Sequence, residues 1–360
     1  MTLLDVKNLK TYYTEDDGGQ VRATDDVSFS LEPGETLGLV GESGSGKTTI
    51  ARSILRLLPD NGRIVDGSIN FNGTDITELS KKEMNRQIRW SEISMIPQNA
   101  MNAFDPVYTV GEQIVEVIKV HENDTTKQEA IERGRILFEE LGIDPDRIHD
   151  YPHQFSGGMA QRAMIALALT LNPSLILADE PTTALDVVIQ DRILDTIKDM
   201  QEDIGSAMIL ITHDMSVVSE TCDRIAVCYG GRIVEIADTE TIITNPRHPY
   251  TLGLGNAFPD ISMNDQELIS IPGTPPNLVD PGEGCRFAPR CPYETEECWD
   301  ITPPSETVQE NHKVECHRAE EYEYIQSTAG DPETWDQVSE TDSSLAETDS
   351  SLATTGGDDD

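Results

Sequence analysis

The sequence predicts an α/β fold whose central strands are buried and parallel, with helices between them. Short apolar runs at 175–178, 208–212 and 225–229 are typical of strands covered on both faces. Another apolar run, at 36–40, enters a glycine-rich loop that is followed by a helical pattern over 48–58. At 360 residues, the chain is long enough for one large domain and a smaller one.

The rest of the chain divides by composition. Residues from about 99 to 170 look helical and lack strand patterns, so we expect a helical subdomain inserted into an α/β core over 1–255. Over 256–325, Pro and Gly become frequent and four cysteines gather, which predicts a small Cys/Pro-rich C-terminal extension. Residues 326–360 are polar and acidic and repeat ETDSSLA, so we expect a disordered tail. Two further strand patterns lie at 3–9 and 27–31.

The chain is strongly acidic throughout. It has 66 acidic and 26 basic residues, a formal charge of −40. Residues 326–360 hold ten acidic and no basic residues, so a charge of −30 remains on residues 1–325. Such a surface repels nucleic acid and stays soluble in strong salt, where screening removes its self-repulsion. We expect a salt-adapted host, such as a halophilic archaeon, and no nucleic-acid partner.

The sequence contains no membrane-spanning or secretory pattern. Its longest apolar run, 163–169, is far shorter than the ~20 residues that a membrane helix needs. The first ten residues, MTLLDVKNLK, lack the features of a secretory signal. We therefore expect a cytoplasmic protein that reaches a membrane only through partners.

The glycine-rich loop over residues 41–48 fits the pattern G-x-x-x-x-G-K-[ST]. Its glycines let backbone N–H groups curl around phosphate oxygens, and the following helix adds a favourable dipole. Lys47 would reach the β- and γ-phosphates, and the Thr48 hydroxyl would bind Mg²⁺. A chance glycine-rich turn is a poor alternative, because a strand pattern precedes the loop and a helix pattern follows it.

Two carboxylates, Asp179 and Glu180, end the apolar run at 175–178. Alone this is a weak signal, since strands often end in Asp. Beside a phosphate loop, Asp179 becomes a Mg²⁺ ligand and Glu180 the base that polarises the attacking water. Adjacent carboxylates repel each other, and a bound cation makes the pair tolerable.

A Ser-Gly-Gly segment, Ser156 to Gly158, precedes a helical pattern that includes Gln161. Its N–H groups would offer another ring of donors for a phosphate. Alone, the segment would be read as a simple helix cap. Its place between the phosphate loop and the two carboxylates favours a phosphate site.

In this order along the chain, these motifs resemble those of ABC ATPases. The similar segments are Gly41–Thr48, Gln98, Ser156–Gln161, Asp179–Glu180, Ala184–Asp186 and His213, which look like the Walker A, Q-loop, signature, Walker B, D-loop and H-loop motifs. The resemblance covers residues 1 to about 250. It implies a P-loop NTPase fold with a mixed sheet, an ATPase reaction, and ATP with Mg²⁺ as ligands.

The resemblance also implies the role of each site residue. Glu180, His213 and Lys47 would be catalytic, and Mg²⁺ would be held by Thr48, Gln98 and Asp179. Tyr13 is similar to the aromatic residue that stacks on adenine, with its neighbour Tyr12 as a rival. The ATP-binding set is Tyr13, Gly41, Glu42, Ser43, Gly44, Ser45, Gly46, Lys47, Thr48, Thr49 and Gln98.

The family works as a head-to-tail dimer, so a second ABC ATPase, either a paralogue or this chain itself, is an implied partner. ATP would lie between the phosphate loop of one subunit and Ser156, Gly157, Gly158 and Gln161 of the other. Asp186 would communicate across the dimer. Phe155, Met159 and Ala160 depart from the commonest signature, but none removes a phosphate-binding N–H.

The second half of the chain resembles one branch of the family. Three segments, 247–251, 271–276 and 285–292, look like the C-terminal extension of dipeptide and oligopeptide importer ATPases. The segment 109–114 also resembles that branch, whereas 103–106 departs from it. The branch implies two membrane permeases, an extracellular substrate-binding protein, and a place at the cytoplasmic face of the membrane. It also includes importers of nickel, glutathione and oligosaccharides.

Four cysteines, Cys285, Cys291, Cys298 and Cys316, are separated by five, six and seventeen residues. These spacings are not those of a zinc knuckle or a common ferredoxin, and a reducing cytoplasm disfavours disulfides. Three interpretations stay open: unliganded thiols, zinc, and the [4Fe–4S] cluster that some relatives carry on similar cysteines. Cys222 and Cys228 lie in or beside a strand pattern and are expected to pack as small apolar groups.

The competing class is an ABC ATPase that acts on DNA ends or ribosomes. Chromosome-maintenance types carry long coiled coils between the Q-loop and the signature, but Gln98 and Ser156 are only 58 positions apart. Ribosome-directed types carry two cassettes per chain, and this chain has one. The acidic charge also disfavours nucleic acid. A regulatory role for the cysteine-bearing extension is compatible with transport.

Overall fold

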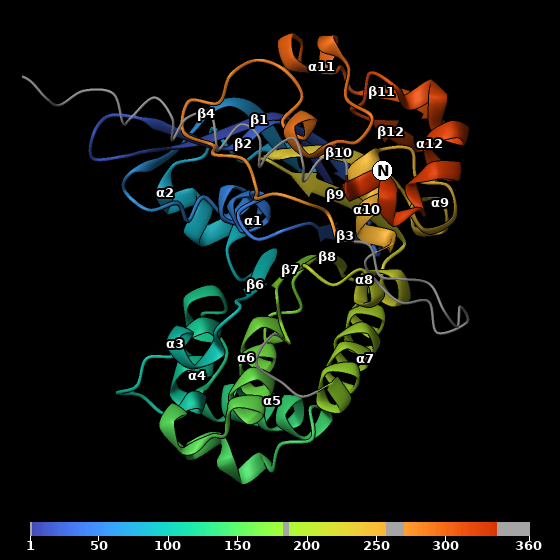
Figure 1. The fold of residues 1–360 in the computed structure, drawn as a ribbon. Helices are drawn as coiled ribbons and strands as arrows, with labels where there is room; N and C mark the ends of the chain where they lie inside the picture. The colour runs from blue at the N-terminus through green and yellow to red at the C-terminus, as the bar shows by residue number, and fades with distance from the viewer. Residues whose placement is uncertain (1, 183–186, 257–269, 337–360) are drawn as a thin grey trace, which may run out of the picture.

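A computed structural model of the protein describes residues 2–182, 187–256 and 270–336 (Figure 1). Its strands are β1 (Leu4–Thr14), β2 (Gln20–Leu31), β3 (Thr36–Val40), β4 (Gly62–Phe71), β5 (Thr74–Asp75), β6 (Ile93–Ile96), β7 (Leu175–Asp179), β8 (Ala207–Thr212), β9 (Arg224–Tyr229), β10 (Arg232–Asp238), β11 (Glu306–Gln309) and β12 (His312–Val314). Its helices are α1 (Lys47–Leu55), α2 (Lys81–Glu83), α3 (Ala100–Ala103), α4 (Val110–His121), α5 (Lys127–Glu140), α6 (Gly157–Leu169), α7 (Val187–Ile204), α8 (Met215–Thr221), α9 (Thr239–Thr244), α10 (Pro249–Asn256), α11 (Glu296–Asp300) and α12 (Tyr322–Ala329), with single turns η1 (Met84–Ile88), η2 (Pro145–His149), η3 (Pro152–Gln154), η4 (Ala288–Arg290) and η5 (Ala319–Glu321).

The strands form two sheets. An eight-stranded sheet runs in the order β11-β12-β10-β9-β3-β8-β7-β6. Strands β9, β3, β8, β7 and β6 are parallel, whereas β11, β12 and β10 are antiparallel to their neighbours. This confirms the predicted mixed sheet. A second, antiparallel sheet runs β2-β1-β4-β5.

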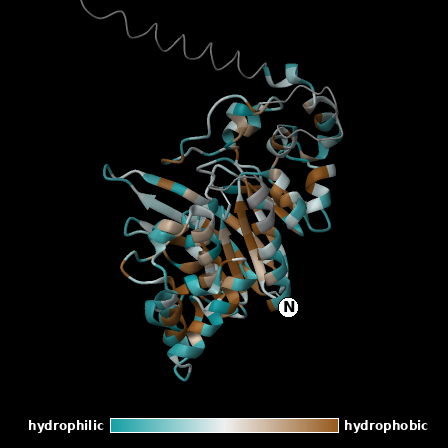
Figure 2. Cartoon of the chain, turned by 90° about the horizontal axis from the view of Figure 1, so that it is seen from below, coloured by the Kyte–Doolittle hydropathy of each residue, from teal (hydrophilic) through white to brown (hydrophobic). Residues whose placement is uncertain are grey.

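The parallel strands are buried on both faces, and their side chains alternate between two apolar cores. In β8, Met208 and Leu210 face one core, and Ile209 and Ile211 face the other. Helix α1 packs in the second core, between the two sheets. Figure 2 shows these strands as a hydrophobic centre surrounded by more hydrophilic helices. The predicted continuous apolar runs follow from this double burial.

The segment from α3 to α6 is helical and lies to one side of the sheets in Figure 1. Helices α4 and α5 each begin with a capping box, in which Thr109 pairs with Glu112 and Thr126 with Glu129. Their apolar faces pack around Phe138 and Ile148, both fully buried. The signature-like Ser156 lies in this segment, at the start of α6.

The C-terminal extension continues the main sheet rather than forming a separate unit. Strand β12 pairs with β10, with Glu235 opposite Val314, and β11 pairs with β12. The predicted extension thus adds two strands to the edge of the main sheet. The two strands are short and polar, so apolar periodicity gave no sign of them.

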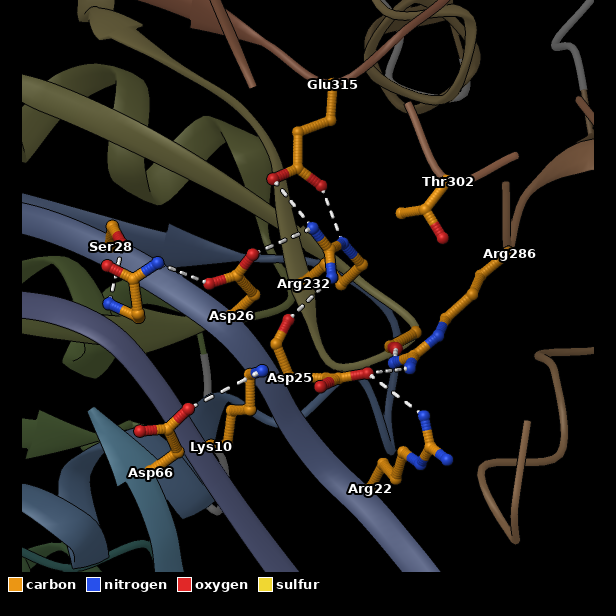
Figure 3. Close-up of polar contacts among 12 residues, drawn as sticks. Lys10, Arg22, Asp25, Asp26, Ser28, Asp66, Arg232, Arg286, Thr302 and Glu315 are labelled. Carbon is orange, nitrogen blue, oxygen red and sulfur yellow. Dashed lines mark hydrogen bonds and ion pairs between the residues drawn. The ribbon is translucent and has the colours of Figure 1, made fainter. Parts of the chain in front are cut away.

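Ion pairs reinforce this junction (Figure 3). Arg232 of β10 donates from Nε to Glu315 at 2.7 Å, and its side chain is 13% exposed. Arg286 of the extension donates to the Asp25 carboxylate of β2 and to the Gly230 carbonyl. Because each buried charge has a partner from the other part, the extension has a defined position on the core.

The predicted tail boundary at residue 326 falls inside α12, which is a correction to the expected disorder over 326–360. Trp335 is 2% exposed, and its Nε1 donates to the Ala329 carbonyl at 3.0 Å. A buried indole anchors this stretch, although its flanking residues are polar and acidic. Residues 337–360 lie outside the described part of the chain.

Candidate functional site

The glycine-rich loop connects β3 to α1 and has the shape of a cradle. A Cβ on Gly41 would lie 2.0 Å from the Cys228 carbonyl oxygen, and one on Gly46 would lie 2.2 Å from the Ala23 oxygen. Gly46 also has φ 99° and is the N-cap of α1. Both positions therefore need glycine, because the loop passes close to backbone on two sides.

Lys47 is folded back onto this loop. Its Nζ donates to the carbonyls of Gly41 and Glu42 at 2.6 and 2.8 Å, and to the Ser45 hydroxyl at 3.3 Å. Burial lowers the pKa of Lys47, and the nearby carboxylates of Glu180, Asp179 and Glu42 oppose that shift. The ammonium group is thus held by oxygen acceptors of the loop itself.

Thr48 and Asp179 meet at the end of β7. The Thr48 hydroxyl donates to Asp179 Oδ1 at 3.1 Å, and Asp179 is 4% exposed. Burial raises the pKa of Asp179, the hydrogen bond from Thr48 lowers it, and repulsion by Glu180 raises it further. A hydroxyl and a buried carboxylate at this distance are suitable oxygen ligands for Mg²⁺.

The carboxylate of Glu180 lies next to two other residues that are predicted to position the attacking water. Gln98 Nε2 donates to Glu180 Oε2 at 2.5 Å, and His213 Nδ1 lies 3.4 Å from Glu180 Oε1. Gln98 follows β6, and His213 follows β8. Because β6, β7 and β8 are parallel neighbours, their carboxyl ends bring these side chains to one edge of the sheet.

The two tyrosines that compete for the adenine role face different surroundings. The Tyr13 hydroxyl lies 3.2 Å from Thr49 Oγ1, next to the phosphate loop. Tyr12 instead donates to Asp25 at 2.8 Å and has the Arg22 guanidinium over its ring. Burial, followed by the Asp25 hydrogen bond, raises the pKa of Tyr12 to about 12. This geometry favours Tyr13 as the stacking residue.

The signature-like segment presents an open helix end. Ser156 is the N-cap of α6, but its side chain does not cap that helix, and a Cβ on Gly157 would meet nothing within 4 Å. Gln161 is only 7% exposed, and its Nε2 has no hydrogen-bond partner among the described residues. The backbone at 156–158 is thus the accessible part of this segment. Asp186, predicted to act across a dimer, lies outside the described residues.

These residues fit a magnesium nucleotide. The cradle is too close to neighbouring backbone for a side chain at Gly41 or Gly46, so its amides stay accessible to a phosphate. Asp179 and Glu180 place two carboxylates side by side, which a cation would stabilise. Glu180 also has φ 46°, an uncommon backbone angle for a non-glycine residue and one often found at functional sites.

Three residues outside the predicted ATPase motifs surround the phosphate loop. Tyr229, Tyr250 and Arg290 reach Glu42 or its immediate partner from outside the ATPase motifs. Tyr250 and Arg290 lie in segments that were recognised as features of a family branch. Those segments carried no assigned role, because sequence spacing does not show that they return to residue 42.

The four extension cysteines line one small cavity, together with His248, Pro249, Phe287, Ala288, Tyr293, His317 and Arg318. Burial raises the pKa of the Cys285 thiol to about 11 and that of Cys316 to about 12. Within the described ranges, no three His, Cys, Asp or Glu side chains are close enough to hold one metal ion. Cys222 and Cys228 are both buried in the apolar core, as predicted.

Fold and site together define an ATPase of the ABC class. A family model for ABC transporters matches residues 24–183. A second model, for the C-terminal region of oligopeptide/dipeptide transporters, matches residues 234–298.

Curated proteins of the same kind align over most of the chain. The oligopeptide transport ATP-binding protein OppD of Bacillus subtilis is 46% identical and covers 87% of each chain. Its Escherichia coli counterpart is 44% identical over 84% of this chain and 90% of its own, and the E. coli dipeptide protein DppD is 42% identical over 88% and 97%. This chain therefore belongs to the oligopeptide/dipeptide family of ABC transporter ATP-binding subunits, and it is an ATPase.

Solved structures agree on the fold. A dimeric ATP-binding cassette in a post-hydrolysis state with ADP and phosphate is 26% identical, with a TM-score of 0.60, over 66% of this chain and 98% of its own. The family membership removes the competing interpretation of a DNA- or ribosome-directed ATPase. None of the helices in the described residues is long and apolar enough to cross a membrane.

Proposed function

We propose that this chain drives uptake of dipeptides or oligopeptides as the ATPase subunit of an importer. The observation that carries the proposal is the C-terminal region of the oligopeptide/dipeptide transporter type, joined to a complete phosphate loop in one chain. The relatives named above are peptide transport proteins, which supports the same cargo here.

The chemistry follows from the site. Lys47 and the loop amides would hold the β- and γ-phosphates, and Thr48, Asp179 and Gln98 would hold Mg²⁺. The magnesium ion would neutralise the phosphate charge when bound. Glu180 orients and deprotonates the attacking water as general base. His213, which lies near Glu180 Oε1, helps to position the same water. Tyr13 would stack on the base beside Thr49.

The active form we propose is a head-to-tail dimer with a second ABC ATPase, either a paralogue or this chain. The accessible amides at 156–158 would close over the nucleotide held by the opposite phosphate loop. The dimer would dock on two membrane permeases at the cytoplasmic face and receive substrate from an extracellular binding protein. Closure on ATP would move the permease helices, and hydrolysis would release them.

The cargo is tested by transport. Native membranes are used to co-purify the assembly, and uptake into vesicles is measured with labelled peptides, nickel, glutathione and oligosaccharides. We expect ATP-dependent uptake of labelled peptides. An excess of nickel, glutathione or oligosaccharide should not inhibit that uptake. Uptake of nickel, glutathione or a sugar without peptide uptake would reassign the cargo and leave the ATPase in place.

For the cysteine cavity we propose a [4Fe–4S] cluster. Four thiols from Cys285 to Cys316 line one buried cavity in a part of the chain with few apolar residues.

Anaerobic purification followed by iron and sulfide assays tests the cluster. We expect about four iron and four sulfide per chain, and their loss in Cys291→Ser. The matched control is Cys222→Ser, whose thiol lies in the apolar core outside this cavity. Colourless protein without iron, or equal iron in both variants, would refute the cluster.

We further propose that the host is salt-adapted, because a charge of −30 remains after the acidic C-terminus is set aside. A haloarchaeal source fits this charge.

A further inference from the structure

The second residue of the phosphate loop, Glu42, is held by Arg290 of the C-terminal extension and by Tyr250 near the end of the core. Arg290 of η4 donates from Nη1 and Nη2 to the two carboxylate oxygens of Glu42 at 2.8 and 3.0 Å. The hydroxyl of Tyr250, in α10, accepts a hydrogen bond from the Glu42 backbone N–H at 3.0 Å. Both the side chain and the backbone of one loop residue are therefore fixed by residues 208 and 248 positions away in the sequence.

Arg290 is a buried side chain with several hydrogen bonds, not one half of a surface ion pair. It is 5% exposed, and each of its guanidinium nitrogens has an acceptor. Nε donates to the Pro272 carbonyl at 2.7 Å, Nη1 also donates to the Tyr229 hydroxyl at 3.2 Å, and Nη2 reaches the Ile271 carbonyl at 3.4 Å. A bidentate pair of this kind fixes orientation as well as distance.

An aromatic cluster holds the two tyrosines in place. The rings of Tyr229 and Tyr250 lie 4.5 Å apart, and each contacts Phe287, at 5.1 and 5.4 Å. Burial raises the pKa of both hydroxyls, so they stay protonated and neutral. Phe287 belongs to the same cysteine-flanked segment as Arg290, between Cys285 and Cys291. We call Arg290 and Tyr250 the clamp; the extension supplies Arg290 and also Phe287, which packs against Tyr250.

The clamp acts on the part of the loop that Lys47 uses. The Gly41 carbonyl shares a peptide with the Glu42 N–H and accepts from Lys47 Nζ at 2.6 Å, so the peptide that Tyr250 holds also sets one lysine contact. To reach a phosphate, Lys47 must exchange this carbonyl for phosphate oxygens while the loop keeps its shape. A loop without the clamp would have to be ordered by the nucleotide itself, at the expense of affinity.

We propose that Arg290 and Tyr250 are positioning residues for ATP binding, which makes the extension a structural part of the nucleotide site. The proposal rests on the ATP site described above and does not depend on the cargo or on a metal in the cysteine cavity. Its effect belongs to ground-state binding, because Arg290 and Tyr250 act on Glu42 of the phosphate loop. We therefore expect the KM for ATP to change much more than kcat.

The test uses the full chain and measures ATPase kinetics together with equilibrium binding of a fluorescent ATP analogue. Arg290→Met and Glu42→Gln should each raise the KM and the Kd about tenfold, with kcat within about threefold, because each loses a charge-assisted pair. The double variant should be no worse than the worse single variant, since both remove one interaction. Arg290→Lys keeps the charge without the fork and should restore part of the affinity.

Arg286→Met is the matched control. This arginine is buried in the same segment and holds the extension to Asp25 rather than to Glu42. Its KM for ATP should stay within about twofold of wild type. Tyr250→Phe removes only a hydroxyl, so it supplies a second measurement if Arg290→Met does not fold; it should raise the KM severalfold.

Equal KM values for the Arg290 and Arg286 variants, or additive effects of Arg290→Met and Glu42→Gln, would overturn the inference. So would an unchanged KM in Tyr250→Phe if Arg290→Met cannot be purified. Wild-type protein without ATPase activity would instead contradict the enzymatic assignment, so the two failures are distinguishable.

Discussion

At the residue scale, the site depends on a few side chains that are brought to one edge of the main sheet. Glu180 is the meeting point, with Gln98 on one carboxylate oxygen and His213 near the other. Its positive φ lies at the turn that follows β7. Thr48 and Asp179 lie beside it on the phosphate side. Metal and phosphate binding thus uses Asp179 with Thr48, whereas water activation uses the neighbouring Glu180. Substitutions at these residues should therefore affect binding and hydrolysis separately.

Glu180→Gln should abolish hydrolysis while leaving nucleotide binding intact. The amide keeps the size of the side chain but cannot accept a proton, so kcat should fall by about 10²–10⁴-fold. Single-turnover hydrolysis and ATP-dependent dimerisation by gel filtration measure the two effects. The exposed Glu139→Gln on α5 is the control and should match wild type. Undiminished ATPase activity in Glu180→Gln would remove the assigned base.

Gly46→Ala should destabilise the protein more than Gly44→Ala. Both glycines have positive φ, so either alanine costs about 1–2 kcal/mol of backbone strain. The Cβ at 46 also meets the Ala23 oxygen at 2.2 Å, whereas nothing lies within 4 Å at 44. We expect about 1–3 kcal/mol of additional loss in the free energy of unfolding at position 46, measured by urea titration. Equal losses would show that the loop can move away from β2.

At the element scale, the extension is held by three different kinds of contact. Strand β12 adds hydrogen bonds to β10, the pairs Arg232–Glu315 and Arg286–Asp25 add charge, and α12 packs against α10. Trp335, which follows α12, also packs on α10, and its ring would lie 2.8 Å from a Cβ at Gly253. The glycine in α10 therefore makes room for the indole, which binds the end of the described chain to the core.

Trp335→Ala should lower the free energy of unfolding by about 3–5 kcal/mol, because it empties a buried aromatic site and removes the bond to the Ala329 carbonyl. Trp299→Ala is the matched control, since that residue is 52% exposed and donates a hydrogen bond from Nε1 to Glu294. It should cost about 1 kcal/mol or less. Denaturant unfolding of both variants is the measurement, and equal costs would contradict the packing of Trp335.

At the scale of the whole molecule, the acidic excess is spread over the chain, while several of the few basic residues are used inside it. Arg232, Arg286 and Arg290 each neutralise a carboxylate across the junction between core and extension. Exposed carboxylates repel one another over a Debye length, and salt screens that repulsion; the buried pairs are screened much less. Added salt should therefore weaken the repulsion between surface carboxylates and leave the buried ion pairs of the junction nearly unchanged.

The melting temperature should rise with KCl, by roughly 10 °C or more between ~0.1 M and ~2 M, as the Debye length falls. Differential scanning calorimetry measures it, with sucrose at equal viscosity as a control for excluded volume. A melting temperature that is flat or falls with KCl would contradict salt adaptation.

Sequence patterns predicted some elements closely and missed others for physical reasons. The run at 36–40 coincides with β3, because strands buried on both faces are continuous apolar segments. Strand β2 begins at Gln20, seven residues before the predicted strand at Val27. The apolar pattern missed this part because residues 20–26 are mostly polar. The ATPase motifs were recognisable because phosphate binding demands fixed local spacing. The contact of Arg290 with Glu42 could not be recognised from the sequence, because the two residues are 248 positions apart.

The pairing of β10 with β12 has a consequence for synthesis of the chain. Strand β10 ends at Asp238, and its hydrogen-bonding partner is made only at 312–314. Until those residues leave the ribosome, the nascent sheet has an open edge that can pair with another chain. Slow translation over 239–311 would prolong that exposure, and a premature stop there would leave the edge permanently uncovered.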